Sequence, residues 1–408
     1  MDGGAQDGGG APAGGGPPAD HGAGGAGPRL EIILAGGTVI DPSQGIHAPA
    51  EVGIVGRRIA AVGERLPRAA GTRVVDCSGS LVVPGLIDLH VHAYTGATDL
   101  SLDPDAMMLQ GGVTTMLDTG SAGYYTWSGF RAQIERARAH VLALVHLCST
   151  GLAAWRVGEL IDPRMADVEK AVAVIREDPT IAVGVKLRAS ARLIGEGEQG
   201  WRHLRMAKEA ARASGTWLMV HIGTSPMTVP EIAAVLDPGD VITHCYVGGH
   251  HKNRILDESG RLYPALREAA AAGIAFDVGH GQGSFDWDVA ERAMDQGFLP
   301  TTISTDLHSG NVAGPVYDLP TTMSKFLLLG MSLDEVVARC TAAPARILGR
   351  AGEIGTLRPG STADVTLLRW VEEDVILYDS YGKGRPATRR LQAAGVIRDG
   401  RIVRAPGA

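Results

Sequence analysis

The amino-acid sequence predicts an α/β protein in which a (β/α)8 barrel of the TIM type carries a small β-sandwich built from both chain ends. Between about residues 83 and 345, eight short apolar runs alternate with stretches of helical periodicity, and this length matches one such barrel. The segments on either side contain only short strands and tight turns. A doubly wound open sheet is the alternative, but no GxGxxG motif follows the first apolar run, as its dinucleotide-binding form requires.

Each predicted barrel strand is an apolar run that ends in turn or polar residues. In chain order the runs are LIDLHVH, VTTMLDTG, VLALVHLCS, AVGVKLRAS, TWLMVHIG, DVITHCY, IAFDVGHG and TTISTDLHS. Helical stretches such as DVEKAVAVIREDP and GWRHLRMAKEAARASG lie between them, and the second ends in a glycine, as helices often do.

The two chain ends predict one composite domain. EVGIVGRRIAAVG holds two apolar runs around a turn, and GVIRDGRIVRA predicts a second hairpin closed by Asp399-Gly400, a pair that favours a tight type I′ turn. We therefore expect residues 29–82 and 346–408 to form the β-sandwich and residues 83–345 the barrel. Residues 1–28 are mostly Gly, Ala and Pro and are expected to be a disordered tail.

Composition excludes several classes of protein. With 408 residues and a net charge of −7, the chain lacks the basic character of a nucleic-acid binder. It contains neither an apolar run long enough to span a membrane nor a signal-peptide pattern at its start. The four cysteines are scattered singly, which favours a reducing, cytoplasmic setting. The expected partner is a small-molecule substrate, and the oligomeric state is left open, a homo-oligomer included.

Six polar residues stand near the ends of five predicted strands, where a barrel places its active site. They are His90, His92, Lys186, His221, His244 and Asp306. Because His90 and His92 are two residues apart in a strand, their side chains lie on one face, as chelation of one ion requires. Imidazole and carboxylate groups suit zinc and neighbouring transition metals. A lone buried histidine is usually a hydrogen-bonded structural residue, but the whole set favours a metal site.

Lys186 is unusual because its surroundings, AVGVKLRAS, otherwise predict a buried strand. Burial lowers the pKa of a lysine, and an unprotonated amine can add CO2 to form a carbamate, an anionic ligand with two oxygens. Such a group can bridge two metal ions about 3.5–4 Å apart, which can share a hydroxide for hydrolysis. The structural alternative is that Lys186 pairs with an acid such as Asp118.

Several motifs resemble the amidohydrolase superfamily, in its binuclear branch with a bridging carboxylated lysine. These are PGLIDLHVH, the VKLR lysine, MVHIG, ITHCY and ISTDLH. FDVGHGQGSF, GPVYDLPTTMSKFLLLGM and GTLRPGSTADVTLL are similar to the amidohydrolase/deacetylase group near the dihydroorotases. The resemblance covers about residues 30–405. It implies two divalent ions, with zinc expected: His90, His92, Lys186 and Asp306 would hold the first, and Lys186, His221 and His244 the second.

Two departures from the relatives narrow the activity that the resemblance implies. Dihydroorotases carry an arginine two positions after the HxH pair, where this chain has Tyr94. Nucleobase aminohydrolases place a glutamate shortly after the histidine of the fifth strand, whereas His221 is followed by IGTSP. Both activities are therefore disfavoured.

The sequence thus predicts a metal-dependent, deacetylase-like hydrolase that cleaves the amide or ester bond of an N-acyl or O-acyl group on a small carboxylate-bearing molecule. A hydroxide bridging the ions would attack the carbonyl, and Asp306 would act as general base and then general acid. A cyclic amidohydrolase of the dihydroorotase or hydantoinase kind, a catalytically silent scaffold and an open-sheet binding protein are the alternatives.

Other residues have a functional and a structural interpretation. Arg188 lies on the same strand face as Lys186 and is expected to bind the substrate carboxylate, unless it pairs with an internal acid such as Asp118. His280 could contact the substrate or the scissile carbonyl, or be structural. His308 could orient Asp306, whereas His146 is expected to be a core residue.

Overall fold

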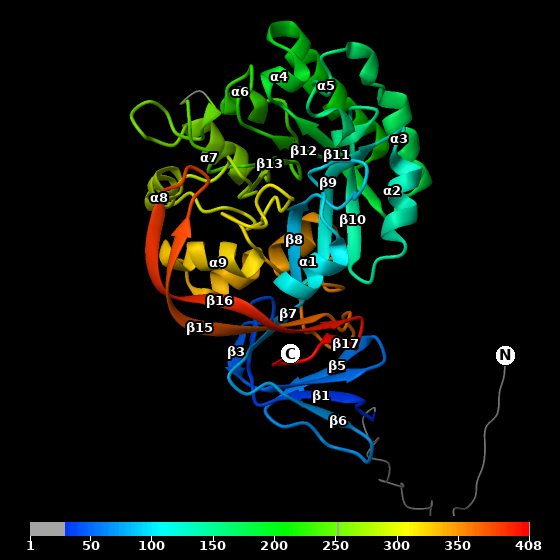
Figure 1. The fold of residues 1–408 in the computed structure, drawn as a ribbon, viewed down its shortest axis with the longest axis vertical. Coiled ribbons are helices and arrows are strands. Elements are labelled where there is room, and N and C mark those ends of the chain that lie inside the picture. Colours follow the sequence, from blue (N-terminus) through cyan, green and yellow to red (C-terminus); the bar gives the residue numbers. More distant parts are fainter. Residues whose placement is uncertain (1–28, 251–252, 408) are drawn as a thin grey trace, which may run out of the picture.

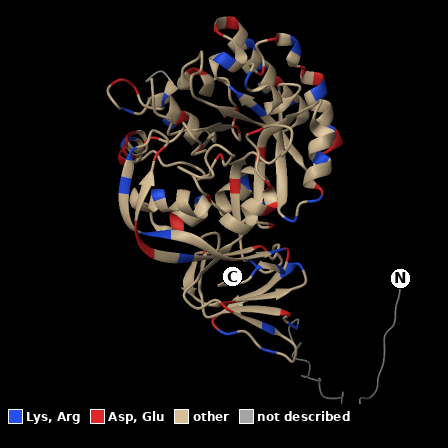
Figure 2. Ribbon diagram, in the orientation of Figure 1, with Lys and Arg blue, Asp and Glu red and all other residues tan. Residues whose placement is uncertain are grey.

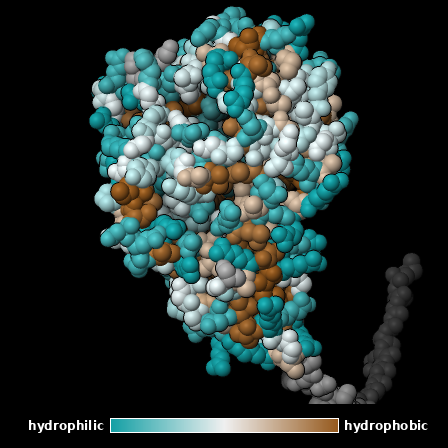
Figure 3. Space-filling view, in the orientation of Figure 1, coloured by the Kyte–Doolittle hydropathy of each residue, from teal (hydrophilic) through white to brown (hydrophobic). Residues whose placement is uncertain are grey.

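The computed structural model describes residues 29–250 and 253–407, so the predicted tail of residues 1–28 lies outside the described residues. Figure 1 shows a sheet ringed by helices, a β domain below it, and a long hairpin that rises from the β domain along one side of the ring. In this view, basic and acidic residues are interspersed over the barrel helices (Figure 2). The surface seen in Figure 3 alternates hydrophilic stretches with separate hydrophobic patches.

Seven parallel strands form most of the barrel wall, with each strand paired to its neighbours in the chain. They are β8 (Leu86–Val91), β9 (Val113–Gly123), β10 (His140–His146), β11 (Ala182–Arg188), β12 (Trp217–His221), β13 (Val241–Thr243) and β14 (Ala275–Asp277). All seven lie within predicted apolar runs or extend them, which confirms the predicted fold class.

The eighth predicted strand closes the ring but forms no regular ladder. It makes two isolated parallel bridges, from Thr302 to Asp277 of β14 and from Leu307 to Val91 of β8. Asp306 lies in this segment with a φ of +49°, and a left-handed residue interrupts the extended backbone that a ladder needs. Regular strand pairing is therefore interrupted at Asp306, one of the predicted metal ligands.

The helices lie outside the sheet (Figure 1). They are α1 (Pro104–Gly111), α2 (Trp127–Ile134), α3 (Val168–Glu177), α4 (Ala191–Ile194), α5 (Gly197–Ser214), α6 (Val229–Ala233), α7 (Pro264–Ala271), α8 (Trp287–Asp295), α9 (Leu319–Leu328), α10 (Leu333–Arg339) and α11 (Ala342–Ile347). The two quoted helical stretches form α3 and α5, and α5 ends before Gly215 at a φ of +70°, as its glycine predicts. Within the described chain, no helix combines the length and apolarity needed to cross a membrane.

Two sheets make up the β domain, and both chain ends contribute to it. One has the order β5-β4-β1-β6 and the other β17-β16-β15-β7-β2-β3. The strands are β1 (Ile32–Ala35), β2 (Thr38–Asp41), β3 (Ile46–Pro49), β4 (Glu51–Val55), β5 (Arg58–Gly63), β6 (Arg73–Asp76), β7 (Leu81–Pro84), β15 (Val365–Tyr378), β16 (Gly384–Arg398) and β17 (Arg401–Arg404). The predicted hairpins appear as β4–β5 and β16–β17, and the second turns at Asp399 and Gly400, both with positive φ.

The β15–β16 hairpin is much longer than the short strand predicted at ADVTLL. Its far half leaves the β domain and packs along the barrel, where the Leu391 amide donates to Ser324 Oγ of α9 at 2.8 Å. Leu377 and Leu391 are buried there in the main core cluster of the barrel. The hairpin therefore connects the β domain physically with the barrel wall.

Asp41 ties the two ends of the chain together inside the β domain. Its fully buried carboxylate accepts from the Leu357 amide at 2.7 Å and from Thr356 Oγ1 at 3.0 Å. The other oxygen of this carboxylate, Oδ1, accepts a hydrogen bond from the Ser43 amide at 3.0 Å. One side chain thus satisfies backbone donors more than 300 residues apart.

Replacing Asp41 by Ala should destabilise the β domain by ~1.5–3 kcal/mol, because the buried Leu357 amide loses a charged acceptor. The thermal unfolding midpoint measures this loss. Asp76→Ala is the matched control, since Asp76 is exposed and its carboxylate, among the described residues, accepts hydrogen bonds from Ser78 alone. Equal midpoints for the two variants would contradict the linking role of Asp41.

Candidate metal centre

The six predicted ligands meet at the mouth of the barrel. His90 and Lys186 lie in β8 and β11, His221 ends β12, and His92, His244 and Asp306 follow strands or lie in the closing segment. Asp306 Oδ1 lies 3.4 Å from His90 Nε2 and 3.1 Å from His92 Nε2. Lys186 Nζ is 3.3 Å from His90 Nε2, and His221 Nδ1 is 2.7 Å from His244 Nε2. The structure therefore brings all six side chains together.

Three of these residues offer a compact set of metal ligands. His90, His244 and Asp306 each present one donor atom, and the three atoms lie within 4.8 Å of one another. The resemblance assigns His90 and Asp306 to one ion and His244 to the other, so the two expected ligand sets face one common space. Nitrogen and carboxylate donors at this density fit divalent transition metals.

Lys186 is fully buried and has no carboxylate within 4.0 Å among the described residues, although a buried lysine is almost always paired. Its Nζ contacts His90 Nε2 and Met219 Sδ, each at 3.3 Å. Burial lowers the pKa of Lys186 to about 7, against the opposing charge of Asp306. Asp118, the suggested structural partner, instead accepts from the Ala93 and Ser121 amides at 2.7 and 2.8 Å. A neutral amine in this place is the form that adds CO2.

The protonation states of the cluster suit cation binding. Burial lowers the pKa values of His90, His221 and His244, the last to about 4, so their imidazoles are neutral at pH 7. Burial alone would raise the pKa of Asp306, but the neighbouring His90 and His92 hold it well below its ordinary value. Neutral imidazole and ionised carboxylate are the ligand forms of both groups.

His90 is oriented by a buried chain of hydrogen bonds. Its Nδ1 donates to Thr243 Oγ1 at 2.9 Å, and that hydroxyl donates to Asp277 Oδ2 at 2.7 Å. Asp277 also accepts from Thr302 and Ser304 at 2.6 and 2.7 Å. The chain directs Nε2 of His90 toward the cluster, as outer partners of metal-binding histidines do. Sequence reasoning missed Thr243 and Asp277, although both stand at strand ends beside named site residues.

The imidazoles of His92 and His244 are held in the same manner. His92 Nδ1 lies 3.1 Å from Ser121 Oγ, and His244 Nδ1 donates to the Gly279 carbonyl at 2.6 Å. A Cβ at Gly279 would lie 2.4 Å from Thr243 Oγ1 and 2.8 Å from His244 Nδ1, so only glycine fits beside the histidines. His244 itself has a φ of +72°, and backbone strain of this kind concentrates at functional sites.

A cavity of about 520 Å3 opens beside the cluster. His221 and Asp306 lie in its wall, together with Arg188, Ser190, Arg192, Trp155, His308 and Tyr381. The volume is within the range of small-molecule sites. The cavity therefore places bound substrate next to the predicted ligands.

Arg188 has an internal partner as well as access to this cavity. Its Nη1 donates to Glu159 Oε1 at 2.6 Å, and the fully buried Glu159 also contacts His146 Nε2 at 3.0 Å through Oε2. Although burial would raise the pKa of Glu159, Arg188 and His146 keep it below its ordinary value. The internal acid is thus Glu159 rather than Asp118, and His146 lies in the core.

His280 does not line the cavity in this conformation and is fully buried. Its Nδ1 lies 2.9 Å from the Gly281 carbonyl, Lys325 Nζ lies 2.7 Å from its Nε2, and its ring stacks on Phe285. Contact between His280 and substrate would require one of these bonds to be replaced.

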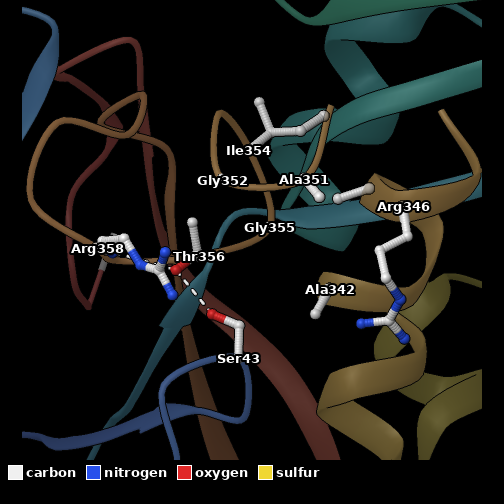
Figure 4. Close-up of a pocket in the computed structure, with 10 residues that line it drawn as sticks. Ser43, Ala342, Arg346, Ala351, Gly352, Ile354, Gly355, Thr356 and Arg358 are labelled. Carbon is white, nitrogen blue, oxygen red and sulfur yellow. Dashed lines mark hydrogen bonds between the residues drawn. The ribbon is translucent and has the colours of Figure 1, made fainter. Parts of the chain in front are cut away.

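A second cavity of about 230 Å3 lies between α11 and the loops of the β domain (Figure 4). Ser43, Thr356, Arg346 and Arg358 are among its lining residues, which include no histidine and no acid. Its chemistry offers no ligand set or acid–base pair. The cavity beside Asp306 is the candidate site because two of the predicted metal ligands, His221 and Asp306, lie in its wall.

Comparison with known proteins identifies related chains. The pattern of the amidohydrolase family matches residues 264–403. A deacetylase of Agrobacterium fabrum is 39% identical over 327 residues, which cover 80% of this chain and 79% of the relative. The crystal structure of an adenine deaminase superposes with a TM-score of 0.84 at 32% identity, covering 92% of this chain and 100% of that one. The crystal structure of a dihydroorotase gives 0.83 at 33% identity, with coverages of 92% and 99%.

Replacing Thr243 by Val should weaken metal binding about 10- to 100-fold, because His90 loses its orienting partner. Competition with a chelator, followed by metal analysis of the protein, measures the change. Thr119→Val is the matched control, since Thr119 is also buried in the barrel but its hydroxyl has no partner among the described residues. A Thr243 variant with the affinity of the control would exclude the orienting role.

Proposed function

Because the chain belongs to the amidohydrolase superfamily and is a hydrolase of carbon–nitrogen bonds, we propose that it removes an N-acyl or O-acyl group from a small, carboxylate-bearing molecule. One observation carries this proposal: the six predicted metal ligands converge at the wall of a cavity that an arginine also lines. A carbonyl bound at the ligands and a carboxylate bound at Arg188 would occupy one cavity.

The proposed cofactors are two divalent ions, with zinc as the metal best suited to the ligands, and a CO2-derived carbamate on Lys186. His90, His92, Lys186 and Asp306 would hold one ion, and Lys186, His221 and His244 the other. Ions held by these residues would supply Lewis-acid chemistry, which activates water at neutral pH. The burial of Lys186, with no carboxylate of the described residues within ion-pair distance, supports this assignment.

Asp306 is the proposed catalytic acid and base. It is ionised, it lines the cavity, and its Oδ1 faces His90 and His92. A Cβ at position 281 would lie 2.7 Å from Asp306 Oδ2, so Gly281 leaves that oxygen accessible. Asp306 takes a proton from the attacking water and returns it to the leaving group.

Arg188 is the proposed carboxylate-binding residue. Its Nη1 is held by Glu159, which fixes the guanidinium at the cavity wall, and within the described residues this is its one ion pair. The remaining donors of the planar group can bind a carboxylate in a bidentate manner. Ser190 and Arg192 line the same wall and add polar donors.

The two activities named for the related crystal structures find less support in this chain. Tyr94 occupies the position where dihydroorotases carry arginine, and its hydroxyl donates to the Thr126 carbonyl at 3.1 Å, away from the cavity lining. Residues 222–226, after His221, contain no carboxylate that could serve a deaminase. A cyclic amidohydrolase remains the second candidate, on the strength of the similarity to a dihydroorotase structure.

We place the proposed reaction in the cytoplasm. The four cysteines are all free and buried, which agrees with a reducing compartment.

Replacing Arg188 by Met should lower kcat/KM for N-acyl amino acids by about 2–4 kcal/mol, roughly 30- to 1,000-fold, while neutral amide analogues lose much less. Metal content should not change. Because Glu159 would be left as an unpaired buried charge, the variant is also made with Glu159→Gln. Arg346→Met, in the second cavity, is the matched control. Equal losses for charged and neutral substrates would assign Arg188 to structure.

Replacing Lys186 by Ala should abolish turnover and reduce bound metal, because the proposed bridge between the ions is removed. A short carboxylic acid in the buffer should restore part of the activity. Lys208→Ala is the control: Lys208 is also buried but pairs with acids, at 2.8 Å from Asp237, and its loss should cost stability without acid rescue. Two bound ions and an unchanged kcat in the Lys186 variant would contradict the bridge.

A further inference from the structure

The tip of the β15–β16 hairpin, residues 379–383, reaches the cavity beside Asp306. The hairpin starts in the β domain and runs along the barrel toward α8 (Figure 1). Tyr381 at its tip lines the cavity together with Arg188 and Asp306. The β domain therefore contributes a residue to the candidate site.

Tyr381 connects two loops of the barrel mouth. Its hydroxyl accepts a hydrogen bond from the Gly248 amide at 3.0 Å and donates one to the Gly283 carbonyl at 2.8 Å. Gly248 lies in the loop after β13 and Gly283 in the loop after β14. One phenol thus holds both loops at the edge of the cavity.

The ring of Tyr381 also packs directly on the backbone of the first loop. A Cβ at position 248 would lie 2.9 Å from both Cε2 and Cζ of the ring. Any side chain at position 248 would displace the ring, so the glycine and the tyrosine fit as a pair.

The tip is fixed by several further contacts. Asp379, which is buried, accepts from the Tyr381 and Lys383 amides at 2.8 and 2.9 Å. The Ser380 amide donates to the Phe285 carbonyl at 2.9 Å, and Trp287 Nε1 of α8 donates to the Lys383 carbonyl, also at 2.9 Å. The hairpin tip is therefore a fixed wall rather than a loop that closes over substrate.

We propose that Tyr381 is a specificity-determining residue whose ring limits the size of one substrate substituent. This inference rests on the proposed function. With the carboxylate at Arg188 and the scissile bond at Asp306, two groups of the substrate remain, the acyl group and the side group of the acid. The inference assigns the side group to the part of the cavity lined by Tyr381 and Val247. Both present apolar surface, and an aromatic ring favours a compact apolar group against its face.

The test compares kcat/KM for N-acetyl amino acids with small and with bulky apolar side groups, using metal-loaded full-length protein. Tyr381→Ala should raise the bulky-to-small ratio at least ~10-fold, the scale on which apolar pockets discriminate. Tyr381→Phe keeps the ring and should keep the wild-type ratio. Tyr378→Ala is the control, because Tyr378 is an exposed aromatic of the same hairpin that does not line the cavity.

Amide hydrogen exchange gives a second readout that needs no turnover. Loss of the hydroxyl in Tyr381→Phe should speed hydrogen exchange of the Gly248 amide, which donates to that hydroxyl, whereas Tyr378→Ala should leave the exchange rate unchanged. A wild-type ratio in Tyr381→Ala, or the same shift in Tyr378→Ala, would overturn the inference. If wild-type protein cleaves none of the substrates, the proposed function fails. Separately, an unchanged exchange rate of the Gly248 amide in Tyr381→Phe would show that the Tyr381 hydroxyl does not hold this loop in place.

Discussion

The burial of Lys186 at the mouth of the barrel, without an ion pair to any described residue, is the constraint on which the site depends. Lys186 is buried and forms no ion pair with a described residue, and its pKa, lowered to about 7, makes the neutral amine far more accessible at neutral pH than in a solvated lysine. Around it stand neutral imidazoles and one ionised carboxylate, Asp306. Burying so many electron-pair donors without a cation beside them would cost free energy of folding. The same set is a favourable environment for divalent ions.

The barrel and its inward-facing ligands could be predicted because both leave local patterns in the sequence. An apolar run that ends in histidine, lysine or aspartate predicts a strand, and it also predicts that the polar residues at its end lie at the mouth of the barrel. The orienting partners leave no such pattern. Thr243 and Asp277 are ordinary strand residues until the fold places them behind His90. Likewise, Glu159 pairs with Arg188 from a loop 29 positions away, a separation that no periodicity reveals.

The length of the β15–β16 hairpin could not be predicted for a different reason. Residues 372–374 are Glu-Glu-Asp, which interrupts the apolar alternation that would mark a continuing strand. In the structure the strand continues through them, since they are exposed while Leu377 beyond them is buried against the barrel. Tertiary packing overrides the local pattern here. The position of Tyr381 at the cavity follows from that packing.

The pairing of the first strands with the last has a consequence for biosynthesis. β7 pairs with β15, and the buried Asp41 binds the amide of Leu357. The strands β1–β7 are made before the barrel and pair largely with one another, yet β15, the second partner of β7, is made only after the whole barrel has been translated. Such distant contacts form late. Until then the sheet of β7, β2 and β3 lacks its neighbour β15, and the Tyr381 wall of the pocket is added only after the barrel strands have been made.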